Sequence, residues 1–97
     1  MTARAEIDRI VRRQRVLGAA MLGDPAWEIL LDLADAGSLK TSAVGASTRI
    51  PLTTALRYID MLESRGLVER QGNQSDARLT VVSLSEAGRE AVERCLA

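Results

Sequence analysis

Apolar residues recur along this chain with two different spacings, and the spacings divide it into helices and strands. Steps of three and four residues, which place side chains on one face of an α-helix, recur in five segments. The predicted helices cover residues 4–22, 24–36, 41–48, 51–65 and 85–96. Two short segments, residues 67–70 and 78–84, have the composition of strands. Between them, the polar segment 71–77 predicts a long hairpin loop.

The third and fourth predicted helices are separated by a break before Pro51, because the residue before a proline disfavours helical geometry. Along the fourth helix, the inward stripe is Leu52, Ala55, Leu56, Ile59 and Leu62. The side chains away from the stripe are Thr53, Thr54, Arg57, Tyr58 and Met61. A second helix with an exposed polar N-terminal half is typical of a helix-turn-helix, in which this helix reads DNA.

A helix-turn-helix followed by a hairpin predicts a winged helix-turn-helix. We expect an α+β fold, mostly α, with an N-terminal amphipathic helix and a two-stranded β-wing. The 97 residues suffice for one domain, with residues 1–23 as the N-terminal helix and 24–97 as the winged-helix core. The predicted inward positions of the second and last helices are Trp27, Leu30, Leu31, Ala34, Gly88, Ala91, Val92 and Cys95.

The charge balance is neutral overall but uneven along the chain. Thirteen basic and thirteen acidic residues cancel, which does not favour nucleic-acid binding. Residues 40–78 nevertheless contain six basic and four acidic side chains, whereas residues 24–35 contain four acidic and none that is basic. The arginine run Arg9, Arg12, Arg13 and Arg15 could clamp phosphates, and we favour a solvated helix face.

The residue inventory argues against catalysis. Histidine is absent and Cys95 is the single cysteine, so the commonest general base and a soft metal-ligand cluster are both missing. We therefore expect no enzyme, no metal and no cofactor. No apolar run is long enough to cross a bilayer, so we expect a cytoplasmic protein without a membrane partner. Cys95 could be a redox switch, but its place on an apolar stripe favours a buried, inert thiol.

Two stretches carry a resemblance to a known family. TALRYIDMLESRGLVER and then DARLTVVSLSEAG, in this order and spacing, resemble the MarR family of bacterial transcription regulators over roughly residues 25–97. The resemblance implies a recognition helix in the major groove and a wing arginine, Arg78, held by Asp76 in the minor groove. As an alternative to the minor-groove role, Arg78 is an exposed strand residue that pairs with Asp76. The predicted DNA contacts are Thr53, Thr54, Arg57 and Tyr58 in the helix, and Arg70, Asn73, Gln74, Asp76 and Arg78 in the wing.

The same resemblance bears on assembly. MarR-like proteins continue beyond the wing into helices that form the dimer, whereas this chain ends about a dozen residues after Ser85. The apolar face of the N-terminal helix packs either on its own domain or on a partner chain, and we favour a homodimer contact through Ile7, Ile10, Val11, Leu17 and Met21. In the family a small-molecule effector binds between the dimer helices and the DNA-binding domain, and here the identity of any effector is open.

The resulting hypothesis is sequence-specific binding to double-stranded DNA and regulation of transcription, with repression as the commoner outcome in the family. The alternative is a winged-helix module that binds another protein without strong DNA binding. The zero net charge and the acidic second helix suit that alternative.

Overall fold

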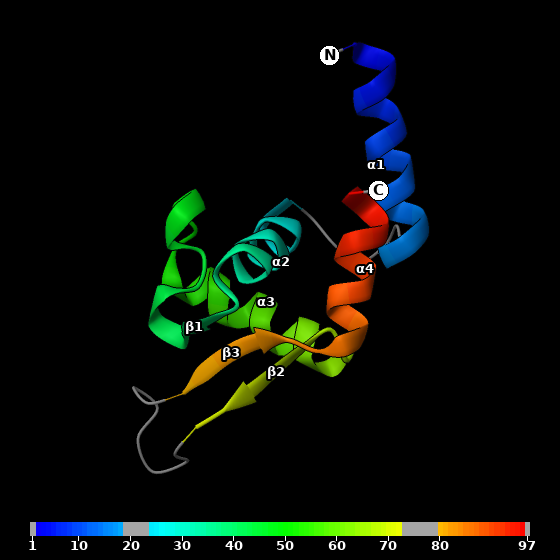
Figure 1. Cartoon of the computed structure of the whole chain (residues 1–97). Helices are drawn as coiled ribbons and strands as arrows, with labels where there is room; N and C mark the ends of the chain where they lie inside the picture. The colour runs from blue at the N-terminus through cyan, green and yellow to red at the C-terminus, as the bar shows by residue number, and fades with distance from the viewer. Residues whose placement is uncertain (1, 19–23, 73–79, 97) are drawn as a thin grey trace.

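A computed structural model describes residues 2–18, 24–72 and 80–96 of the chain. Within these residues, the helices and strands follow the order expected of a winged helix (Figure 1). The α-helices are α1 (Ala3–Leu17), α2 (Asp24–Ala36), α3 (Leu52–Ser64) and α4 (Glu86–Leu96). The strands are β1 (Ser38–Lys40), β2 (Val68–Gln71) and β3 (Val81–Leu84), and two short 3₁₀ helices are η1 (Thr41–Ala43) and η2 (Ala46–Thr48). The mostly helical α+β class is confirmed.

The first helix is shorter than predicted. The side chain of Thr2 accepts a hydrogen bond from the N–H of Ala5 and so caps the start of α1. The helix ends at Leu17 because Gly18 has a φ of 94°, which leaves the helical region. A helix over 4–22 is therefore wrong at its C-terminal end.

The predicted third helix is replaced by η1 and η2. Gly45 lies between them with a φ of 84°, and its carbonyl oxygen accepts a 2.9 Å hydrogen bond from the N–H of Ile50. A left-handed residue cannot continue an α-helix, so the turn tightens into two 3₁₀ segments. The prediction of one helix over 41–48 is wrong for this reason.

The hairpin belongs to a three-stranded antiparallel sheet with the order β1-β3-β2. The predicted hairpin pairs Val68 with Leu84 and Gln71 with Val81. The third strand, β1, pairs with the other edge of β3, with Leu39 opposite Val82. The predicted two-strand hairpin is therefore confirmed, and its returning strand has a second partner in β1, which the sequence did not predict.

The core lies between α2, α3, α4 and the sheet. Its largest fully buried side chains are Ile29, Leu30, Leu33, Val44, Ile59, Leu62, Val68 and Val82. The inward positions of α4 are confirmed, but Ala34 of α2 is exposed and Trp27 is half-buried. In α3, Leu52 is exposed, whereas Tyr58 and Met61 are half-buried against the core. The apolar stripe of α3 is thus rotated slightly from its predicted position.

The start of α4 is tied to the end of α3. Gly66, with a φ of 75°, ends α3, and the N–H of Leu67 returns to the carbonyl oxygen of Leu62 at 3.0 Å. Ser85 caps α4 by accepting a 3.0 Å hydrogen bond from the N–H of Gly88. A Cβ atom at Gly88 would collide with the carbonyl oxygen of Leu67, so glycine permits this close approach.

Helix α1 packs alongside α4, and its N-terminal half extends beyond the body of the molecule (Figure 1). Ile7, Ile10 and Val11 are 43–44% exposed, as a surface that contacts another chain requires. Leu17 is instead buried in the chain's own core, which corrects its assignment to a dimer contact. Met21, the remaining predicted contact, lies outside the described residues.

Candidate nucleic-acid interface

The N-terminal half of α3 presents part of the predicted polar face. Thr53 and Arg57 are exposed and lie one helical turn apart, so both side chains project from one side. Thr54 and Tyr58 are half-buried, and Tyr58 packs against the core. Of the predicted helix contacts, Thr53 and Arg57 are therefore the more accessible.

The turn before α3 adds a cation that sequence reasoning missed. Arg49 is exposed and adopts a left-handed conformation with φ 61° and ψ 35°. It is the one non-glycine residue with positive φ within 2–18, 24–72 and 80–96. Such a conformation costs an L-residue roughly 1–2 kcal/mol and is concentrated at functional sites. The signal available in the sequence was an arginine placed immediately before the break at Pro51.

Leu52 is a second residue that the pattern did not assign to the surface. It begins α3 and is 48% exposed, next to Thr53. An apolar side chain beside a polar reading face can contact the methyl group of thymine. The stripe pattern concealed it, because Leu52 lies in helical register with the buried residues Ala55 and Ile59.

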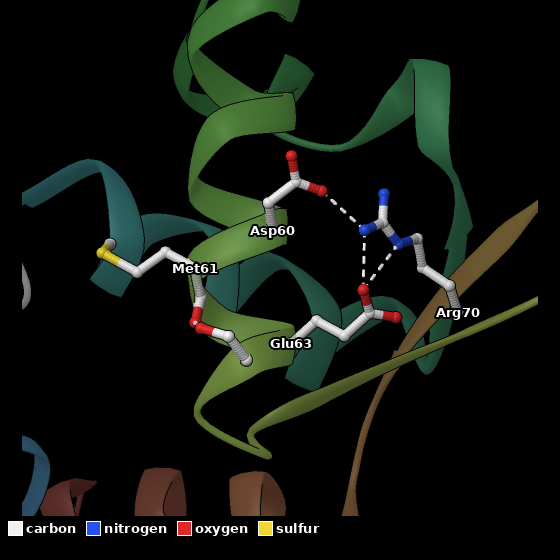
Figure 2. Close-up of polar contacts among 5 residues, drawn as sticks. Asp60, Met61, Glu63 and Arg70 are labelled. Carbon is white, nitrogen blue, oxygen red and sulfur yellow. Dashed lines mark hydrogen bonds and ion pairs between the residues drawn. The ribbon is translucent and has the colours of Figure 1, made fainter.

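The predicted wing contacts divide into two groups. Asn73, Gln74, Asp76 and Arg78 lie outside the described residues, so their roles stay predictions. Arg70 is described, and it points towards α3 (Figure 2). Its Nη2 atom donates to Oδ1 of Asp60 at 2.5 Å and to Oε1 of Glu63 at 2.6 Å, and its Nε atom donates to the same Glu63 oxygen at 3.2 Å.

The electrostatics of this cluster follow from the contacts. The hydrogen bond from Arg70 lowers the pKa of Glu63 below 4.5, against an opposing effect of partial burial. The hydrogen bond that Arg70 donates to Glu63 also raises the pKa of Arg70 above its usual value, so the arginine stays charged. The cluster joins one guanidinium group to two carboxyl groups.

A separate groove of about 590 Å³ lies between α1, α2 and the end of α4. Arg9, Arg12 and Arg13 line it together with Trp27 and Cys95. The guanidinium carbon of Arg13 lies 5.5 Å from the ring centroid of Trp27, a cation–π distance. Glu6 and Asp8 line the groove as well, and Arg9 pairs with Glu6 at 3.4 Å, so the groove combines charges of both signs with an aromatic surface.

Cys95 lies at this groove but is buried. Burial raises the pKa of its thiol above 9.0, and the charges of Arg13, Arg12 and Arg94 oppose that shift. The protonated thiol is therefore the main form at neutral pH, in agreement with the predicted buried thiol.

Within the described residues, no cluster of three or more His, Cys, Asp or Glu side chains could hold a metal ion. No helix in the described part of the chain is long and apolar enough to cross a bilayer.

Comparison with known proteins agrees with the geometry of α3 and the sheet. A family model described as the MarR family matches residues 22–80. The uncharacterized HTH-type transcriptional regulator YwaE of Bacillus subtilis is 31% identical over 85 residues, which cover 88% of this chain and 50% of YwaE. The chain spans about half the length of the curated relatives it matches.

Two solved structures show where the fold recurs. BpsR of Bordetella bronchiseptica, whose DNA binding is regulated by 6-hydroxynicotinic acid, superposes with a TM-score of 0.75 and 26% identity, covering 96% of this chain and 70% of that one. A mutant MarR from E. coli complexed with operator DNA superposes with a TM-score of 0.68 and 23% identity, covering 95% of this chain and 69% of that one. At this identity the second likeness concerns the fold alone.

Proposed function

The chain belongs to the MarR family, and from that premise we propose that it binds double-stranded DNA sequence-specifically and regulates transcription. The MarR-like regulator then works as a homodimer on a two-fold site in the cytoplasm. Phosphate contacts supply most of the affinity, and the base edges met by α3 supply the sequence preference.

One observation carries the proposal: α3 has a free polar face beside a strained, exposed cation. Thr53 and Arg57 project from one side of α3, and Arg49 lies in the turn immediately before it. A threonine can bond a base or a phosphate, and an arginine can bond guanine through two donors. The first turn of α3 contains no acidic residue that would repel phosphates.

The test begins with selection of bound duplexes from a random pool, where a recovered palindrome supports both the function and the two-fold symmetry. Arg57→Ala should then weaken binding of the recovered duplex by about 1–3 kcal/mol and relax the preference at one position. The matched control is Arg94→Ala. Arg94 is an exposed arginine in the last turn of α4, at the end away from the hairpin (Figure 1). Equal, unchanged affinities in both variants would contradict the proposal, and so would binding to a protein without salt-dependent DNA affinity.

For the wing, the proposal keeps Arg78 as the minor-groove probe positioned by Asp76, with Asn73 and Gln74 beside them. An arginine gains from the enhanced negative potential of a narrow minor groove rather than from one base. Arg78→Ala should therefore weaken different duplexes by similar factors in a mobility-shift assay at low salt. An unchanged dissociation constant would remove Arg78 from the interface.

The apolar side of α1 supports the homodimer. Ile7, Ile10 and Val11 recur at helical spacing along α1 and are 43–44% exposed, so they form an apolar surface that another chain can cover. A second copy of the same helix can cover such a surface through a two-fold contact.

A small aromatic anion is the effector class that we propose for the groove between α1, α2 and α4. The arginines that line the groove can attract a carboxylate, and Trp27 can stack on a ring. Because the chain has one tryptophan, titration with 6-hydroxynicotinic acid should change the Trp27 fluorescence with saturation. Arg13→Gln should weaken that response, whereas a linear response in both proteins would exclude the site for this probe.

A further inference from the structure

The recognition helix carries two carboxylates that a DNA-reading surface would be expected to avoid. Asp60 and Glu63 follow Arg57 along α3 at steps of three residues, and their side chains are 66% and 41% exposed. Residues three apart lie close together on a helix surface, so Asp60 adjoins Arg57 and Glu63 adjoins Asp60. An unneutralised pair there would repel the phosphates on either side of a groove.

Arg70 meets both carboxylates with one guanidinium group. Its side chain is 29% exposed, the lowest exposure of the three. Glu63 receives two hydrogen bonds from it and Asp60 receives one (Figure 2). Charge-assisted contacts of this fork-like kind fix geometry as well as charge. All three hydrogen bonds run from Arg70 to side chains of α3, so its guanidinium group is poorly placed to bind a phosphate.

Arg70 also comes from the wing rather than from α3. It lies in β2, opposite Val82 of the central strand. Its side chain therefore joins the outgoing strand of the hairpin to the recognition helix, at a point separate from the backbone turn through Gly66. Because β2 continues to Gln71 at the base of the hairpin, this link bears on how the hairpin is aimed relative to α3.

We propose that Arg70 is a positioning residue that neutralises Asp60 and Glu63 and holds the wing against the recognition helix, and that it does not itself contact DNA. This inference rests on the proposed DNA-binding function. It replaces the expectation that Arg70 belongs to the DNA-contacting wing residues, and it makes the two acidic residues of α3 compatible with a DNA surface.

A double-mutant cycle separates this role from direct contact. Arg70→Gln should weaken binding of the duplex recovered from the random pool by about tenfold, because two carboxylates near the phosphates lose their counter-charge. In the Asp60→Asn, Glu63→Gln background no carboxylate remains to be exposed. There, Arg70→Gln should change the dissociation constant by less than about threefold, because an exposed charge pair contributes little free energy.

The matched control is Arg65→Gln. Arg65 is an exposed arginine at the end of α3, so this change removes the same charge close by. Its effect should be the same in both backgrounds. If Arg70→Gln also weakens binding equally in both backgrounds, Arg70 contacts DNA directly and the inference is overturned. An absence of any effect of Arg70→Gln in the native background would overturn it as well.

A measurement without DNA keeps this inference distinct from the proposed function. Carbon-13 NMR titration of the Glu63 carboxyl group should show its pKa rising towards 4.5 in Arg70→Gln, with wild-type circular dichroism. Amide exchange at β2 should become faster in the same variant. If these changes occur and no duplex is recovered, the proposed function fails while the link between β2 and α3 stands. If neither change occurs, the link itself is disproved.

Discussion

The hydroxyl group of Ser85 donates a 2.5 Å hydrogen bond to the carbonyl oxygen of Gly66, 19 residues earlier in the chain. The same hydroxyl caps α4, so one buried side chain serves the end of α3 and the start of α4. Ser85→Ala should lower the free energy of unfolding by about 1–3 kcal/mol, measured by urea denaturation. Ser42→Ala, at an exposed serine of η1, is the control and should stay within about 0.5 kcal/mol of wild type. Equal stabilities of the two variants would contradict a structural role for Ser85.

Gly45 in the turn before α3 can be compared with Gly37, which follows α2 and has the same φ. Gly45 and Gly37 both have a φ of 84°, but a Cβ atom would lie 3.0 Å from Cβ of Ile50 only at Gly45. Gly37→Ala should therefore cost the left-handed strain alone, about 1–2 kcal/mol. Gly45→Ala should cost more, because Ile50 must also move. Thermal unfolding of both variants would measure the difference, and a smaller loss at Gly45 would show that the turn adapts freely.

Replacement of Arg49 separates backbone strain from charge. Arg49→Gly relieves the left-handed conformation, so the free energy of unfolding should be unchanged or rise by up to about 1 kcal/mol. The same variant should lower the slope of log affinity against log salt by about 1, because one phosphate contact is lost. A more stable variant with an unchanged salt slope would mean that Arg49 does not meet DNA.

Substitutions on the exposed side of α1 should change the mass of the assembly rather than the stability of the fold. Ile10→Ser with Val11→Ser should reduce the dimer fraction in sedimentation experiments, since the apolar surface available to a second copy is lost. Leu52→Ser is the matched control, because Leu52 is exposed to a similar extent but lies on α3. A wild-type protein that stays monomeric as its concentration rises would refute the contact.

Leu17 lies in the core rather than on the exposed side of α1. Leu17→Ala should therefore lower the free energy of unfolding by about 2–5 kcal/mol, as the truncation of a core side chain does.

Cys95 predicts a pH-dependent reactivity. Its pKa is raised above 9.0 by burial, so the thiolate is scarcer in the folded than in the unfolded chain near pH 8. Alkylation by iodoacetamide should be at least about tenfold slower in the folded protein than in urea. The stability associated with the neutral thiol should be complete below pH 9.0 and decline as the pH rises through the folded pKa. Equal alkylation rates in both states would show that the thiol is accessible.

The sequence was most informative where a regular spacing met a single buried face. Ala55, Ile59 and Leu62 recur at helical steps, and α3 buries all three. The end of α3 at Gly66 and the cap at Ser85 were also readable, because each depends on one residue type at one place. These local signals were enough to define the helix-turn-helix and its hairpin.

Features that depend on distant neighbours could not be read in the same way. Strand β1 has three residues, and its pairing with β3 is set by a segment more than 40 residues later. Leu17 and Ile10 are similar in the periodic pattern, yet α4 packs near one end of α1 and leaves the other end exposed. The contacts of Arg70 with Asp60 and Glu63 depend on how β2 lies across α3, which no periodicity reveals.

The register pair Gln71–Val81 has a consequence for how this protein can change over time. It fixes the two ends of the intervening segment one strand spacing apart, and β1 supports the returning end from the far side. Segments of different length or composition can therefore be grafted between these two anchor points while the core remains the same. Such changes come at little cost in stability, so under the proposed function this segment can alter the affinity for duplex DNA while α3 keeps its sequence preference.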